Sequence, residues 1–291
     1  MSFEDLPPLP PLLRPEAAGY AARAMALTRE AQKTHRVAID LPYGGDYWQK
    51  ADVYQPAGAT PGGWPVVVFF HGGAWTNGTK EWMGFMAPTL LAIPVVYVAA
   101  NYRLAPTCRH PGPLEDCCDV IAWVARNIAH YGGNPARIFM GGHSAGGHLA
   151  ALAVLSRDLL ARRNVAPASI AGCLPVSGSF DLRQRRAPAD SMERRVYDVL
   201  LASEDDDAGA SPIQLVEGNR VPFYIAYGER DFPRLVNQGA AMVDALRRNG
   251  SMVRSDIFPG LDHFEANLVG CIDETYPWLS TVRAWTGGRI V

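Results

Sequence analysis

Short segments in which nearly every residue is apolar recur along the chain. Residues 66–70 read Val-Val-Val-Phe-Phe, and residues 95–99 read Val-Val-Tyr-Val-Ala. Further apolar or β-like runs lie at 36–41, 50–54, 137–140, 169–176, 221–227 and 254–258. A strand that is apolar throughout, rather than alternating, is typical of a parallel sheet that is buried on both faces. The pattern therefore predicts such a sheet at the centre of the molecule.

Stretches with helical spacing separate these runs. They lie at 113–130, 145–161, 234–249 and 273–285, and an alanine-rich stretch at 16–33 precedes the first strand. Strand and helix alternate, and parallel strands are joined by crossover connections, so helices are expected on both faces of the sheet. The predicted fold class is α/β, with a mostly parallel central sheet.

Two segments interrupt this alternation. The chain of 291 residues favours one main domain over 36–291, preceded by residues 1–35, an arm with five prolines between 6 and 15 and then the alanine-rich helix. Residues 183–220 read as an insertion over the carboxyl edge of the sheet. Either segment is a candidate lid or cap over a site at that edge.

Composition and charge exclude several classes of function. A formal net charge of −2 provides no footprint for nucleic acid or an anionic membrane, and no apolar run approaches the length of a membrane span. The five cysteines include no C-x-x-C pair, so no disulfide framework or zinc site is expected. The start, Met1–Asp5, lacks a basic region followed by an apolar one, so no signal peptide is expected. The acidic run at 204–207 suits a solvated loop better than a calcium site. We expect a cytoplasmic protein without metal or cofactor.

Residues 142–146 read Gly-His-Ser-Ala-Gly, directly after a predicted strand and before a helix-forming stretch. In a G-x-S-x-G turn the serine sits at strained backbone angles with its hydroxyl clear of the sheet. The two glycines leave room where a Cβ would clash. The pentapeptide alone also arises by chance, but the flanking strand and helix make Ser144 a candidate nucleophile.

A nucleophilic serine needs a base and an acid that orients the base. Among the seven histidines, His263 lies in a loop after the last β-like run, at the edge where a parallel sheet brings its post-strand loops together. Asp231, after the run at 221–227, is the candidate acid, and Glu229 is the second choice. Asp231 would also suit a helix N-cap. The order serine, acid, histidine is the one expected of this arrangement.

The loop at 71–75, His-Gly-Gly-Ala-Trp, follows the strand at 66–70. Its small residues would let backbone N–H groups face a developing negative charge, and the residue after the serine would supply another N–H at a helix N-terminus. The predicted oxyanion donors are Gly72, Gly73, Ala74 and Ala145. Of the nearby histidines, His143 is expected to point away from the serine and His148 to be packed.

These motifs together resemble the α/β-hydrolases. The loop at 71–73, the segment Asn-Tyr-Arg-Leu-Ala-Pro at 101–106 and the residues from Gly142 to Ala150 are similar to hormone-sensitive-lipase-like esterases. The segments similar to the arylformamidase (kynurenine formamidase) branch are 177–182, 211–213 and 262–264. The resemblance runs from about residue 52 to the C-terminal helix. It implies an α/β-hydrolase fold with Ser144, Asp231 and His263 as the triad.

The resemblance implies a serine hydrolase that cleaves small carboxylic esters or aryl formamides through an acyl-enzyme. Ala74 departs from both subgroups, since the first usually has glycine there and the second an aromatic residue, so the choice of substrate stays open. A peptidase or amidase of the same fold and a non-catalytic binding protein are the alternatives. Trp75 and Phe264 are candidate pocket walls. The proline-rich arm could pack on its own domain or on a second copy in a homodimer.

Overall fold

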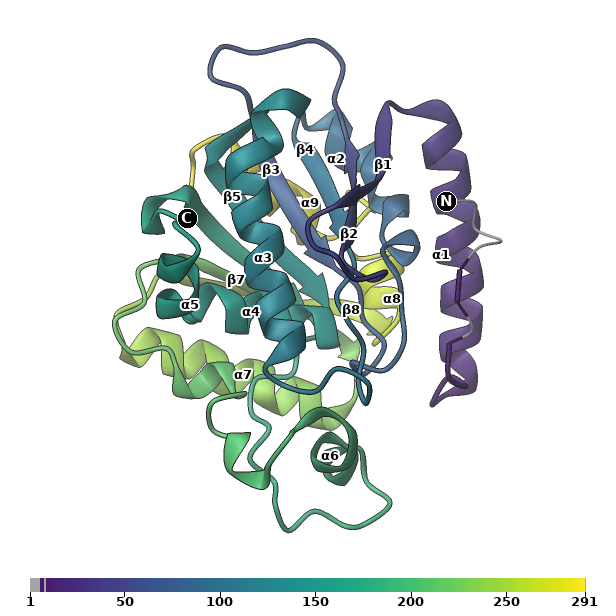
Figure 1. Cartoon of the computed structure of the whole chain (residues 1–291), viewed down its shortest axis with the longest axis vertical. Helices are drawn as coiled ribbons and strands as arrows, with labels where there is room; N and C mark the ends of the chain where they lie inside the picture. Colours follow the sequence, from purple (N-terminus) through teal and green to yellow (C-terminus); the bar gives the residue numbers. More distant parts are fainter. Residues whose placement is uncertain (1–5, 8, 291) are drawn as a thin grey trace.

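The computed structural model describes residues 6, 7 and 9–290 (Figure 1). The interpretation of Met1–Asp5 and the Pro8 position of the arm lie outside the described residues. The described part of the arm has no helix or strand before α1 begins at Pro15.

The centre of the molecule is an eight-stranded sheet. Its strands are β1 (Val37–Pro42), β2 (Lys50–Tyr54), β3 (Trp64–Phe70), β4 (Val96–Ala100), β5 (Gly133–His143), β6 (Ile170–Val176), β7 (Phe223–Arg230) and β8 (Val253–Asp262). They lie side by side in the order β1-β2-β4-β3-β5-β6-β7-β8. β2 runs opposite in direction to the other seven strands, and every pairing from β4 to β8 is parallel. The prediction of a mostly parallel α/β sheet is confirmed.

Helices cover both faces of this sheet (Figure 1). The α-helices are α1 (Pro15–Thr34), α2 (Ala87–Ala92), α3 (Gly112–Asn127), α4 (Ala145–Leu155), α5 (Arg157–Arg162), α6 (Met192–Arg195), α7 (Pro233–Arg248), α8 (Glu265–Leu268) and α9 (Pro277–Thr286). The short 3₁₀ and π elements are η2 (Lys80–Trp82), η3 (Gly84–Met86), η4 (Ile128–Tyr131), η5 (Pro167–Ser169), η6 (Val196–Leu200), η7 (Glu204–Asp206) and η8 (Pro212–Gln214).

Successive residues of the central strands are buried in two different cores. In β3, Val66 and Val68 pack with residues of α3, α4 and α7 on one face. Val67 and Phe69 pack with residues of α1, α2 and α9 on the other face. All four side chains are fully buried. Because neither face meets water, the strand is apolar at every position rather than at alternate ones.

The helix expected at 145–161 is two helices, α4 and α5. The break is at Ser156, whose backbone angles (φ −80°, ψ 59°) are not helical. Its hydroxyl donates a hydrogen bond to the carbonyl oxygen of Leu152 at 2.7 Å. Serine competes in this way with the helical backbone for its own carbonyl groups. The short helices α2 and α8 were not predicted, because four to six residues are too few for a periodic pattern.

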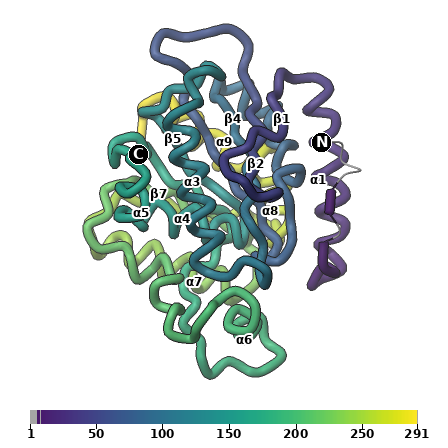
Figure 2. The backbone as a smooth tube through the Cα atoms, viewed as in Figure 1, coloured from purple at the N-terminus to yellow at the C-terminus, as the bar shows by residue number. Residues whose placement is uncertain are grey.

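The N-terminal helix α1 stands at one side of the molecule, along the region that holds η2 and η3 (Figure 2). A buried hydrogen bond fixes it, since the Tyr20 hydroxyl donates to the Asn267 Oδ1 of α8 at 2.7 Å. Tyr20 also packs edge-on against Trp82 of η2, with ring centroids 5.9 Å apart. These contacts join the first described helix to the last third of the chain.

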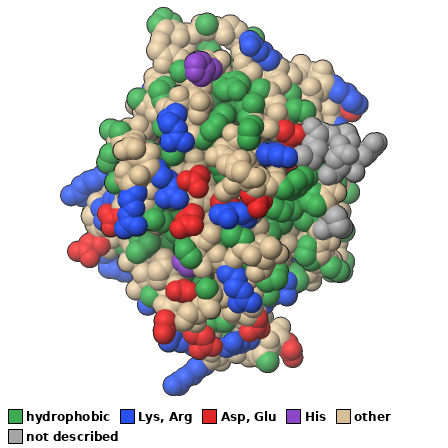
Figure 3. Space-filling model, viewed as in Figure 1, with side chains coloured by type: hydrophobic (Ala, Val, Ile, Leu, Met, Phe, Trp, Pro, Cys, Tyr) green, Lys and Arg blue, Asp and Glu red, His purple; other side chains and the backbone are tan. Residues whose placement is uncertain are grey.

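The segment 183–220 contains α6 and the short elements η6, η7 and η8. Charged side chains of both signs gather over the part of the surface near α6 (Figure 3). The acidic run at 204–207 is solvated in part, as expected, since Glu204 and Asp205 are exposed. Its first three residues form η7 with a Ser203 capping box. Asp207 differs from the expectation, because it is buried and bonded to Arg185 at 2.9 Å and to the Tyr197 hydroxyl at 2.9 Å, and it therefore helps to fold the insertion.

Candidate active site

Ser144 lies at the turn between β5 and α4, with left-handed backbone angles (φ 56°, ψ −117°). A side chain at Gly146 would place its Cβ 2.2 Å from the carbonyl oxygen of Phe70, and one at Gly142 would lie 2.3 Å from the backbone of Gly146. Both distances are far below van der Waals contact, so only glycine fits either position. The chain reverses so tightly that the Ser144 hydroxyl is raised out of the sheet.

The structure brings three predicted side chains into one chain of hydrogen bonds. His263 directly follows β8, and its Nε2 lies 3.0 Å from the Ser144 Oγ. Its Nδ1 lies 2.8 Å from the Asp231 Oδ1, and Asp231 directly follows β7. Because the Asp231 carboxylate accepts a hydrogen bond from the Nδ1–H, the proton of the neutral imidazole stays on Nδ1, and Nε2 is left free to accept the proton of the serine hydroxyl. This is the geometry of a nucleophile, a base and an orienting acid.

Asp231 is held in its ionised form. Burial favours the neutral acid, but the hydrogen bond and charge of His263, with smaller contributions such as the Phe232 N–H, outweigh it and lower the pKa of Asp231. The alternative acid, Glu229, is exposed and accepts a hydrogen bond from the Gly260 N–H at 2.7 Å. The proposed cap role for Asp231 is wrong, since Phe232 is the N-cap residue of α7.

The loop at 71–75 is strained in a way that exposes its backbone. Gly73, Ala74 and Trp75 all have positive φ angles, of 121°, 52° and 62°. Within residues 6–7 and 9–290, the N–H groups of Gly73 and Ala74 donate to no other group. Ala145 is the first residue of α4, where a helix leaves its N–H without an internal partner. Gly72, Gly73, Ala74 and Ala145 all line the cavity that holds Ser144.

Two buried histidine contacts hold this loop in place. The Trp75 indole N–H donates to the His148 Nδ1 at 3.0 Å, and the His148 Nε2 donates to the carbonyl oxygen of Ala210 at 2.7 Å. His148 thus ties the loop to the insertion, and burial lowers its pKa to about 4. On the other side, the His71 ring stacks on Tyr102 with centroids 4.3 Å apart, and the Tyr102 hydroxyl donates to the His71 carbonyl oxygen at 3.0 Å.

The expectation that His143 points away from the site is wrong. Its Nε2 donates to the carbonyl oxygen of His263 at 2.9 Å, and the centroids of the two rings lie 4.7 Å apart. Burial lowers the pKa of His143 to about 3, so the ring is neutral. The residue beside Ser144 therefore supports the backbone of His263. Sequence alone carries no signal for this, because it depends on how the loop after β8 folds back.

The cavity above Ser144 has a volume of about 450 Å³. Its aromatic lining consists of Tyr20, Trp75, Trp82, Phe232 and Phe264. Trp75 and Phe264 were candidate pocket walls, whereas Phe232 and Tyr20 were missed. Phe232 adjoins the acid as Phe264 adjoins the histidine, so the same reasoning could have found it. Tyr20 and Arg14 come from the N-terminal segment, and nothing in their neighbourhood of the sequence indicates where that segment packs.

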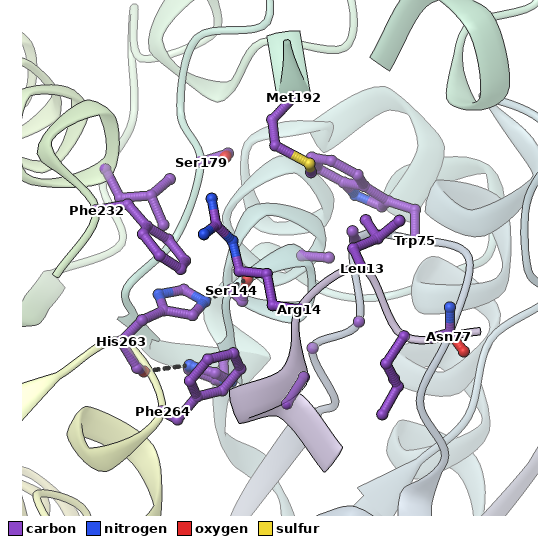
Figure 4. A pocket seen from close by; sticks show the side chains of 18 of the residues that line it. Leu13, Arg14, Trp75, Asn77, Ser144, Ser179, Met192, Phe232, His263 and Phe264 are labelled. Carbon is purple, nitrogen blue, oxygen red and sulfur yellow. Dashed lines mark hydrogen bonds between the residues drawn. The ribbon is translucent and has the colours of Figure 1, made fainter. Parts of the chain in front are cut away.

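The cavity is bounded by both segments that were considered as lids. Leu12, Leu13, Arg14, Ala17 and Tyr20 come from the arm and α1, and the insertion contributes residues 190–193 (Figure 4).

In the described residues, no cluster of histidine, cysteine and acidic side chains suits a metal ion. Among residues 6–7 and 9–290, no helix is long and apolar enough to cross a bilayer.

The order of the sheet and the placement of the three side chains after β5, β7 and β8 define an α/β-hydrolase. Solved structures share this fold. An esterase from Pyrobaculum calidifontis superposes with a TM-score of 0.76 at 22% identity, over 94% of this chain and 93% of that one. A putative thioesterase from Silicibacter superposes with a TM-score of 0.78 at 22% identity, over 92% and 94% of the two chains.

The family model named BD-FAE matches residues 51–246, so the chain belongs to the BD-FAE family. Curated relatives include the esterase LipQ of Mycobacterium tuberculosis, 33% identical over 73% of this chain and 53% of LipQ. A kynurenine formamidase of Danio rerio is 30% identical over 86% of this chain and 82% of its own length. The chain thus spans about half the length of LipQ and most of the formamidase. The resemblance to both subgroups is confirmed.

Proposed function

We propose that this protein is a serine hydrolase that cleaves small carboxylic esters or aryl formamides, with Ser144 as nucleophile, His263 as base and Asp231 as orienting acid. The observation that carries the proposal is the continuous hydrogen-bonded chain from the Ser144 Oγ through both ring nitrogens of His263 to Asp231, at 3.0 and 2.8 Å. Named relatives that are esterases and a formamidase support the same chemistry.

The reaction follows from this geometry. The Ser144 Oγ attacks the carbonyl carbon as its proton passes to the His263 Nε2, and the carbonyl oxygen becomes an oxyanion facing the N–H groups of Gly73, Ala74 and Ala145. Collapse of this intermediate breaks the bond to the alcohol or amine, which leaves with the proton from His263. A water molecule then attacks the acyl-enzyme with His263 again as base, and releases the acid and free Ser144.

Both candidate substrates fit the same steps, because each presents an acyl carbonyl carbon to Ser144, and they differ in the acyl group and in the leaving group, an alcohol or an amine. The five aromatic side chains that line the cavity favour a flat or apolar group on the substrate. We also propose that α1 and residues 183–220 together form the cap of a catalytic domain over 36–291. The support is that both segments contribute residues to the wall of the cavity.

The test is hydrolysis of p-nitrophenyl acetate, p-nitrophenyl octanoate and N-formylkynurenine by the pure protein. Ser144→Ala and Asp231→Asn should each lower kcat on the order of 10⁴-fold, because the first removes the nucleophile and the second the acceptor that sets the tautomer of His263. Glu229→Gln is the matched control and should change kcat by less than about threefold. Hydrolysis of all three substrates that survives Ser144→Ala would refute the proposal.

A further inference from the structure

An arginine lies against the wall of the cavity beside the proposed base. The guanidinium carbon of Arg14 is 4.4 Å from the centroid of the Phe232 ring. That ring in turn packs against His263, with centroids 4.7 Å apart. The side chain reaches from the N-terminal segment into the cavity, above Ser144 and His263 (Figure 4). A positive charge is thus held one aromatic ring away from the reacting groups.

Four charged side chains line the cavity, and two of them neutralise each other. Arg234 pairs with Glu193 at 3.0 Å and donates to the Ser179 hydroxyl at 2.9 Å. Asp190 lies at the exposed rim. Arg14 is an exposed residue whose side chain forms no hydrogen bond or ion pair with any described residue, and its guanidinium lies over the face of Phe232. Its five N–H donors are therefore available to a ligand.

A guanidinium that rests on an aromatic face keeps its edge free, and that edge matches the two oxygens of a carboxylate. The ring removes water from one side of the cation, which strengthens its interaction with an anion over that of a fully solvated arginine. One unpaired arginine supplies a single positive charge, so a monoanion is the matching partner.

We propose that Arg14 binds a carboxylate of the substrate and makes this site selective for anionic esters or formamides over neutral ones. The inference rests on the proposed hydrolase function and names a substrate class for it. Arg14 acts in it as a specificity residue that contacts the substrate but takes no part in the transfer of protons.

The experiment compares kcat/KM for two pairs of substrates that differ in charge. The first pair carries the charge on the acyl side, as p-nitrophenyl succinate monoester against its methyl ester. The second carries it on the leaving group, as 3-acetoxybenzoate against methyl 3-acetoxybenzoate. For at least one pair, Arg14→Met should lower the ratio of anionic to neutral kcat/KM about tenfold, mainly through KM. Arg14→Lys should retain part of the preference, since it keeps the charge without the planar fork.

The control variant is Arg23→Met, which removes an exposed arginine of α1, the helix that follows Arg14, at a position outside the cavity lining. It should leave both ratios unchanged. Raising NaCl to about 0.5 M should lower the ratio of anionic to neutral kcat/KM for the unmodified protein, because salt screens partly exposed charges. The ratio for Arg14→Met should not change.

The possible failures are distinguishable. Ser144-dependent hydrolysis with ratios that Arg14→Met does not alter would overturn the role of Arg14 and leave the hydrolase function standing. An equal change in Arg23→Met would also overturn it, because the effect would then be the net charge of the helix. Absence of Ser144-dependent hydrolysis for every substrate would refute the proposed function and this inference with it.

Discussion

Replacement of His148 by phenylalanine tests whether the strained loop at 71–75 depends on a buried contact with the insertion. His148 accepts from the Trp75 indole N–H and donates to the Ala210 carbonyl oxygen, at 3.0 and 2.7 Å. Phenylalanine keeps the ring but neither bond, and leaves one buried donor and one buried acceptor without partners. At about 1–3 kcal/mol for each such group, the variant should lose about 2–6 kcal/mol of unfolding free energy at pH 7.5.

The pH dependence of this loss gives a sharper signature. Burial lowers the pKa of His148 from 6.5 to about 4, so between these values the unfolded chain binds a proton that the folded protein does not. The contribution of His148 to stability is therefore present above about pH 6.5 and is lost as the pH falls toward 4. By linkage, the stability lost between pH 7.5 and pH 5 amounts to about 2 kcal/mol. His148→Phe lacks this term, so its deficit should shrink by about 2 kcal/mol between pH 7.5 and pH 5.

The assay is urea unfolding of both proteins at the two pH values, with kcat for p-nitrophenyl acetate measured alongside. His130→Phe is the matched control, because His130 is exposed in η4 and should tolerate the change within about 0.5 kcal/mol. We expect kcat of His148→Phe to fall about tenfold or more as the loop loosens. A stability deficit equal to that of His130→Phe, or one that is the same at both pH values, would refute the reasoning.

Two further substitutions test the framework around the site. Lys80→Met removes an ammonium that lies 2.6–3.0 Å from three carboxylates and is 3% exposed. Urea unfolding should therefore show a loss of about 3–5 kcal/mol of unfolding free energy. The control Lys33→Met breaks an exposed ion pair and should cost less than about 0.5 kcal/mol. Equal losses would contradict this account. Gly146→Ala should abolish activity and lower the yield of folded protein, because its Cβ would lie 2.2 Å from a backbone carbonyl oxygen. The control Gly45→Ala, whose Cβ would have no atom within 4 Å, should have no such effect. An active Gly146→Ala would count against the proposed turn.

The sheet could be predicted because burial on both faces leaves a local trace in the sequence. Each of β3 and β4 is apolar at nearly every position. The parallel order of β4, β5 and β6 follows from the helices predicted between them. The three side chains of the candidate triad could be proposed for a related reason. Each directly follows a strand, and parallel strands end at one edge, so position along the chain is enough to bring Ser144, Asp231 and His263 together.

Other features depend on contacts that no local pattern records. The position of α1 depends on a hydrogen bond from Tyr20 to Asn267, 247 residues apart in the chain. The orientation of His143 depends on a carbonyl group of the loop after β8. The position of Trp75 depends on His148, which is bonded in turn to the Ala210 carbonyl oxygen of the insertion. Such long-range contacts form only when the sheet has already placed their partners, and nothing in the neighbouring residues indicates them.

The sheet and the segments outside it contribute different parts of the site, and this has a consequence for substrate specificity. The groups proposed to carry the chemistry are held by the sheet, through glycines that tolerate no side chain and through β7 and β8. Part of the cavity wall beyond them comes from α1, the arm before it and residues 190–193, which lie outside the sheet. Substitutions in these outer segments can therefore change which acyl or leaving group is accepted without moving Ser144 or His263. Arg14 is the residue that tests this reasoning most directly, because its unpaired charge lines the cavity from a segment that lies outside the sheet.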